Sequence, residues 1–207
     1  MEVSVFRKLV SLFLLISNAA ALCLAACERA PQSIPTPSNQ QLDAEEQAVY
    51  AVLVKDMFPS SSMLVVMDTT ATDAGGLENT EQTLQHVLAN MHGVASQTVQ
   101  NFKNRNASAT LMQADMDLGV PYVLLSQDAM NQIFSLNQDG WQAFYSKYPQ
   151  APGILTFSRA GFDDALEQAL VYVGSQSHWL AGSGHYILLK KVNGAWSIDQ
   201  KVMTWIS

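Results

Sequence analysis

The sequence predicts an α+β fold in which N-terminal helices pack on a C-terminal antiparallel β-meander. Up to about residue 148, apolar residues recur mainly at helical spacing. From residue 154 onward they form short runs or alternate with polar residues, as they do in strands. Asn193-Gly194, the strongest short hairpin signal, separates the last two strands. Helices followed by such a meander are typical of α+β domains.

The first helix is predicted over residues 43–57, with Asp43 as its N-cap and Glu46 three residues later. Pro59 ends this helix, because proline cannot continue the backbone hydrogen bonding. A buried strand is predicted at residues 63–67, where five apolar residues follow three serines.

Helical spacing and capping residues predict four further helices. The second follows its N-cap Asn79, the third covers residues 94–105, a short one follows Ser126, and the last covers residues 140–148. A second strand is predicted at residues 122–125.

The C-terminal part contains four predicted strands, at residues 154–159, 168–174, 185–191 and 195–206. The ten residues between the second and third of these are expected to form a loop, in which Gly182 and Gly184 permit a positive φ or a bulge. Alternation in the last strand places four apolar side chains on one face: Trp196, Ile198, Val202 and Ile206.

Residues 1–26 have the three-part layout of a secretory signal peptide. Arg7 and Lys8 form a short positive region, residues 9–16 form an apolar core, and small residues follow. The apolar core is too short to span a bilayer comfortably, so the segment is expected to be removed on export.

Leu24-Ala25-Ala26-Cys27 resembles the bacterial lipobox. The resemblance implies that the chain is cut before Cys27 and that this cysteine carries a diacylglyceryl group and an acylated amino terminus. Several acyl chains give stable anchoring, so the membrane is an expected partner through this lipid. Glu28 implies an outer-membrane location in a Gram-negative source, where Asp at that position retains a lipoprotein in the inner membrane.

Residues 27–42 are predicted to be the lipidated cysteine and a disordered tether. Pro31, Pro35 and Pro37 stand there among Ser, Gln and Asn, a composition that stays extended and solvated. Residues 43–207 are then expected to form a single α+β domain.

The last third of the chain resembles an uncharacterised group of bacterial exported proteins with no assigned function. Five segments carry this resemblance: residues 157–162, 168–174, 182–189, 193–196 and 205–207. The resemblance implies no activity. The order of the elements is also similar to cone-shaped folds of the cystatin type, and a likeness of fold does not give function.

Composition excludes several classes of protein. The formal net charge is −7 and the sequence shows no basic stripe, so nucleic acid is not an expected partner. The two cysteines are Cys23, in the signal peptide, and Cys27. If Cys27 is acylated, the mature chain has no thiol for catalysis, metal binding or a disulfide.

The segment 174–191 contains two possible catalytic or metal-binding arrangements. His178 and His185 are too few for a tight zinc site, so no metal and no cofactor are predicted. Ser183 and His185 share a strand face and form the alternative, an envelope hydrolase, for which no orienting acid can be named. No catalytic residue is therefore assigned.

The candidate contact residues are Trp179, His178, His185 and Arg159. Trp179 stands in a polar segment and is expected to be an exposed anchor. Arg159 is expected to pair with Asp163 or Asp164, or with a ligand carboxylate.

The function expected from the sequence is that of a lipid-anchored protein of the bacterial envelope. It binds or assists rather than catalyses, and its partner is an envelope protein, a peptide or a small ligand. Besides the hydrolase, a purely structural envelope component is the remaining alternative.

Overall fold

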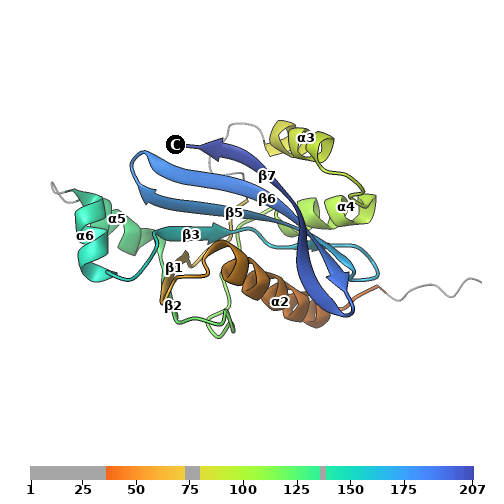
Figure 1. Ribbon diagram of the computed structural model, residues 1–207, viewed down its shortest axis with the longest axis horizontal. Helices are drawn as coiled ribbons and strands as arrows, with labels where there is room; N and C mark the ends of the chain where they lie inside the picture. The colour runs from red at the N-terminus through yellow and green to blue at the C-terminus, as the bar shows by residue number, and fades with distance from the viewer. Residues whose placement is uncertain (1–35, 73–79, 136–138) are drawn as a thin grey trace, which may run out of the picture. The chain divides into compact units, whose positions relative to one another are not determined.

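The computed structural model describes residues 36–72, 80–135 and 139–207, which form an α+β domain as predicted (Figure 1). The predicted signal peptide, Cys27 and most of the tether lie outside the described residues, as does Asn79. Within the described ranges, no helix is both long and apolar enough to cross a membrane.

The described helices and strands alternate along the first part of the chain, and strands alone make up the last part. The helices are α2 (Asn39–Met57), α3 (Thr80–Asn90), α4 (Ser96–Arg105), α5 (Gln127–Ser135) and α6 (Gly140–Lys147). The strands are β1 (Leu64–Met67), β2 (Tyr122–Leu125), β3 (Ile154–Phe157), β4 (Gly161–Phe162), β5 (Gln168–His178), β6 (Ala181–Val192) and β7 (Ala195–Ile206).

All seven strands belong to one mixed sheet, with the order β2-β1-β3-β5-β6-β7 and with β4 paired to β5. The predicted antiparallel meander is confirmed for β5, β6 and β7. The sequence also indicated β1 and β2, but not that β1 pairs in parallel with both β2 and β3. Parallel neighbours need long crossovers, and the segments that contain α3 to α6 supply them.

Helix α2 begins earlier than predicted. Ser38 is its N-cap and forms a reciprocal capping box with Gln41, so Asp43 is not the cap and residues 39–42 are helical rather than part of a tether. The prediction failed because Asp43 and Glu46 show the same three-residue spacing as the true pair. Both acids instead turn toward the body of the domain, where Glu46 is buried.

Helices cover both faces of the sheet. Successive side chains of a strand point to opposite faces, so Leu64 and Val66 pack with α2 on one face while Val65 packs with α5 and α6 on the other. Helices α3 and α4 lie on this second face too, against β5 and β6, where Tyr172 and Tyr186 belong to their cluster. The second face therefore carries two separate helix pairs.

The hairpin of β5 and β6 is longer than the sequence predicted. The expected ten-residue loop is wrong: β5 runs on to His178, β6 starts at Ala181, and Gly182 and Gly184 lie within the strand. The shorter turn at Asn193-Gly194 is confirmed, with φ of 54° and 81° as a two-residue hairpin turn requires.

The predicted one-sided alternation in β7 is also wrong. Two register shifts relative to β6 insert extra residues, and each one switches the face to which the following side chains point. Trp196 and Ile198 pack with the α2 cluster, whereas Val202 packs with the α3–α4 cluster and Ile206 is exposed.

We predict that Gly161→Ala destabilises the domain by about 1–3 kcal/mol, because helix α4 lies directly on β4. A Cβ atom at Gly161 would lie 2.3 Å from the backbone nitrogen of Phe102, which cannot move alone. Urea unfolding measures the free energy. Gln97→Ala, on the exposed side of α4, is the control and should change it by less than about 0.5 kcal/mol. Equal stability of the two variants would contradict the close packing.

Candidate functional site

Three glycines remove the side chains from a strip of the second sheet face. Gly174 of β5 pairs with Gly184 of β6, and Gln176 pairs with Gly182, so the three glycines are neighbours on the same face. Glycine inside a strand weakens it and often marks a close approach of another group. The structure shows which group approaches two of them.

Trp205 of β7 lies over Gly182 and Gly184. A Cβ atom at Gly184 would lie 2.0 Å from the Trp205 indole nitrogen, and one at Gly182 would lie 3.0 Å from the same ring. The indole nitrogen donates a hydrogen bond of 2.8 Å to the Tyr172 hydroxyl. The two glycines thus allow the indole to lie close to the strands, in a fixed orientation.

Gly174 is buried too, but the Tyr172 side chain rather than Trp205 lies over it. The nearest atom to a Cβ at Gly174 would be the Tyr172 hydroxyl oxygen, at 3.1 Å, and no atom of Trp205 is among the three nearest. A cleft of about 680 Å³ opens at this point, within the usual volume of a small-molecule site. Its lining includes Met67 and Ile154 of the α5–α6 cluster and Tyr172 of the α3–α4 cluster, so it lies between the two helix pairs.

The described side chains around the cleft are polar but uncharged, or aromatic, or aliphatic. Hydroxyl groups come from the segment after β1 and from β3, and amides come from α5 and β5. None of the described lining residues is an Asp, Glu, Lys, Arg or His. The residues used in the argument below are Thr156, Gln127, Gln176, Trp179 and Trp205.

Trp179 is the one predicted contact residue that lines the cleft. It stands at the tip of the β5–β6 hairpin and is 54% exposed, as the sequence predicted. Edge-to-face contacts hold its ring against Phe134, at 5.6 Å between centroids, and Trp141, at 6.4 Å. The Tyr145 hydroxyl of α6 also donates a hydrogen bond to the Ser177 carbonyl oxygen, which fixes the hairpin to this helix.

The two histidines lie away from the cleft lining. The exposed His178 stacks on Trp141, with 6.4 Å between ring centroids. His185 follows Gly184 and therefore points to the opposite face. Its Nδ1 atom is buried without a hydrogen-bond partner among the described residues, and burial, with the nearby charge of Lys201, lowers its pKa.

The geometry around Ser183 does not support the hydrolase alternative. Ser183 and His185 share a face of β6 as predicted, yet no hydrogen bond joins them in the part of the chain that the structure describes. The charge that acts on the His185 pKa is the cation Lys201, whereas a catalytic histidine needs an acid behind it.

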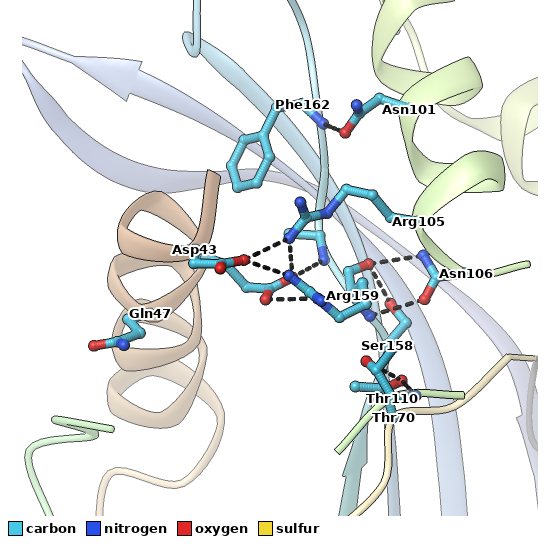
Figure 2. A network of polar contacts seen from close by, with 12 residues as sticks. Asp43, Gln47, Thr70, Asn101, Arg105, Asn106, Thr110, Ser158, Arg159 and Phe162 are labelled. Carbon is cyan, nitrogen blue, oxygen red and sulfur yellow. Dashed lines mark hydrogen bonds and ion pairs between the residues drawn. The ribbon is translucent and has the colours of Figure 1, made fainter. Parts of the chain in front are cut away.

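Arg159 belongs to a buried ion-pair network on the opposite, α2 face (Figure 2). The prediction that Arg159 pairs with Asp163 or Asp164 is wrong. Arg159 donates to Glu46 at 2.8 Å and to Asp43 at 2.6 Å, because α2 brings both acids to the end of β3. Asp163 instead accepts backbone hydrogen bonds in the turn before β5.

Glu46 is the centre of this network. Its carboxylate also accepts from Arg105 of α4, at 3.1 Å, and from the backbone nitrogen of Ala160, at 2.7 Å. Burial acts to lower the pKa of Arg159, but the Glu46 carboxylate outweighs it and the pKa is raised. The guanidinium therefore stays charged and paired, which is a structural role.

A second cavity, of about 240 Å³, lies beside this network and is lined by Tyr50, Arg159, Asp43 and Glu46. The Tyr50 hydroxyl donates to the Ser158 carbonyl oxygen, and burial raises its pKa well above the usual value. Because its charged groups already pair with one another, this cavity is a weaker candidate than the cleft. Among the described residues, no three His, Cys, Asp or Glu side chains gather as metal ligands.

Gly182 and Gly184 were predicted from the sequence to be loop residues, and Gly174 to be the last residue of a strand. The signal that points to a site is the two-residue spacing of Gly182 and Gly184 in β6. Gly174 in the preceding strand and Trp205 in the following strand complete this signal. Thr156, Gln127 and Gln176 were missed, since polar residues of these types are common on any surface.

The chain matches no family model, no curated protein and no solved structure.

We predict that Glu46→Ala destabilises the domain by roughly 3–5 kcal/mol, because it removes the buried carboxylate that pairs with both Arg159 and Arg105 and leaves these half-buried guanidinium groups only the more exposed Asp43. Asp43→Ala, which removes a more exposed acid of the same network, should cost about 1 kcal/mol or less. Thermal and urea unfolding compare the two variants. Equal losses would show that Glu46 has no special place in the network.

Proposed function

We propose that this protein is a lipid-anchored component of the bacterial envelope that binds a ligand in the glycine-floored cleft, without transforming it. The observation that carries the proposal is the cleft of about 680 Å³ beside Gly174, which lies between the α3–α4 and α5–α6 pairs on the second sheet face. Such a cleft, with aromatic rings at its border and scattered polar groups, is the usual form of a small-molecule site.

The cost of the glycines supports this proposal. A glycine within a strand is less favourable than a side chain that packs, by several tenths of a kcal/mol or more. Three of them lie side by side here, and only two are covered by Trp205. The third, Gly174, lies under the Tyr172 side chain and lines the cleft, where a larger side chain would take up part of the volume.

The border of the cleft is held rigidly, which also supports binding. Trp205 is oriented by its hydrogen bond to Tyr172, and the hairpin tip is fixed to α6 through Tyr145. A site that is ordered before the ligand arrives avoids part of the entropy that binding otherwise costs.

The lipid anchor is the second part of the proposal and rests on the sequence. The lipobox-like residues 24–27 follow the apolar segment, and Pro-rich residues separate them from α2. A tether of this kind keeps the domain near the membrane while it meets ligands of the envelope. Glu28 supports the outer membrane in a Gram-negative source.

The anchor predicts a specific mass. The wild-type protein extracted from membranes should have the mass of the chain from residue 27 plus a diacylglyceryl group and one acyl chain. Cys27→Ala should lack that addition and leave the membrane fraction, because the variant has no thiol to modify. Intact mass spectrometry decides between them. An unmodified wild-type chain in the soluble fraction would contradict the anchor.

The cleft predicts a variant that blocks binding without unfolding. Thr156 of β3 lines the cleft and pairs with Gly174, so in Thr156→Phe the new ring takes up part of the cleft volume. Native mass spectrometry after equilibration with the small-molecule fraction of the envelope should show a bound molecule on wild type and on the size-matched control Thr156→Val, but not on Thr156→Phe. The same bound molecules on all three proteins would contradict a role for the cleft.

A further inference from the structure

We infer that the cleft binds an uncharged saccharide, with a sugar ring against Trp179 and its hydroxyl groups bonded to the amides and hydroxyls beside Gly174. The inference rests on the proposed function, because it names the chemical class of ligand for the same cleft. The charge of the cleft lining, its hydrogen-bonding groups and the exposed ring of Trp179 each restrict the class of ligand that fits.

The described lining selects against anionic ligands. No Lys, Arg or His side chain lines the cleft in these ranges. An anionic ligand would lose water on entry without meeting a positive side chain of this lining, which is unfavourable. The arginines of the opposite face cannot help, because Arg159 and Arg105 are already engaged by Glu46.

The polar groups select against purely apolar ligands. The side chains of Gln176 and Thr156 form no hydrogen bond to another described residue, and Gln127 uses one amide hydrogen on Asn131, at 2.9 Å. An acyl chain would strip water from these groups and leave them unpaired. Amide and hydroxyl groups both donate and accept, and a sugar hydroxyl has the same double capacity.

The aromatic border favours a ring with an apolar face. Trp179 has more than half of its surface exposed, and its ring meets those of Phe134 and Trp141 at near-perpendicular angles. The negative face of an indole attracts weakly positive C–H groups, and a pyranose presents such groups on its face while its hydroxyls stand around its edge. Trp205 is less suited to this contact, because its nitrogen is bonded to Tyr172 and its ring lies on the glycines.

The test uses the full lipoprotein in a zwitterionic detergent, since a detergent with a sugar headgroup would compete. Isothermal titration calorimetry compares two uncharged probes, chitotriose and maltotriose, with trigalacturonate as a charged sugar and adenosine as a flat aromatic base. At least one uncharged saccharide should bind saturably, about tenfold or more tighter than trigalacturonate and adenosine.

Variants assign the binding to the cleft. Trp179→Ala removes a side chain that is more than half exposed, with its two ring contacts, so the domain should stay folded with a slightly lower unfolding temperature while its saccharide affinity falls about tenfold or more. Leu180→Ala, at the neighbouring and more exposed position of the same tip, should leave the affinity unchanged. Thr156→Phe should abolish binding.

Each contrary outcome is distinct. Absence of saturable binding to both uncharged saccharides, tighter binding of adenosine or trigalacturonate, or an unchanged affinity in Trp179→Ala would overturn the saccharide inference. If the saccharide inference fails but an envelope molecule still binds to wild type and not to Thr156→Phe, the proposed binding function stands without the saccharide. If wild type and Thr156→Phe hold the same molecules, the proposed function fails as well.

Discussion

The buried carboxylate of Glu46 is the contact on which the arrangement of the domain depends. It joins three segments that are far apart in sequence: helix α2, the end of β3 through Arg159 and Ala160, and helix α4 through Arg105. A buried acid with two guanidinium partners is tolerated only with close geometry, because each charge has lost most of its water. Any shift of α2 along the sheet would separate these charges, so the network fixes the helix in one position.

The two faces of the sheet have different roles as a result. The α2 face is covered, and the charged side chains of Asp43, Glu46, Arg105 and Arg159 pair with one another there. On the other face the helices form two pairs, and the strip between them is shaped by the glycines rather than by large side chains. The stable face holds the strands in register, and that register aligns Gly174 with Gly184 and places Trp205 beside them.

The cleft therefore depends on the regularity of the strands around it. Strands β5 and β6 stay paired almost to the tip of their hairpin, where Trp179 stands. Trp179 therefore lies against α5 and α6 rather than in a mobile loop. The two register shifts in β7 act together, because each one switches the face: after the first, Lys201 turns to the α2 face, and after the second, Trp205 lies on the glycine face opposite Gly184. Loss of one shift alone would point the indole away from the cleft.

The sequence by itself determined the class of fold, most helices, the final hairpin and the exposure of Trp179. These features depend on local spacing, as with Asn193-Gly194, whose positive φ values few residue pairs adopt easily. Similar local patterns led to a wrong helix start, because Asp43 and Glu46 have the same spacing as the true capping pair, Ser38 and Gln41. Polar Ser175 to Gly184 imitated a loop, because strand residues outside a covered core need not be apolar.

Only the tertiary structure decided the partners of Arg159, the parallel pairing of β1 and the existence of the cleft. Each of these joins residues that are many positions apart, as with Arg159 and Glu46, or depends on which face a strand turns after a bulge. The spacing of apolar residues along a sequence indicates whether a segment is a helix or a strand. It does not indicate the register in which two segments pair. Register is set by packing and by buried charges, and it decides where a glycine becomes the floor of a site.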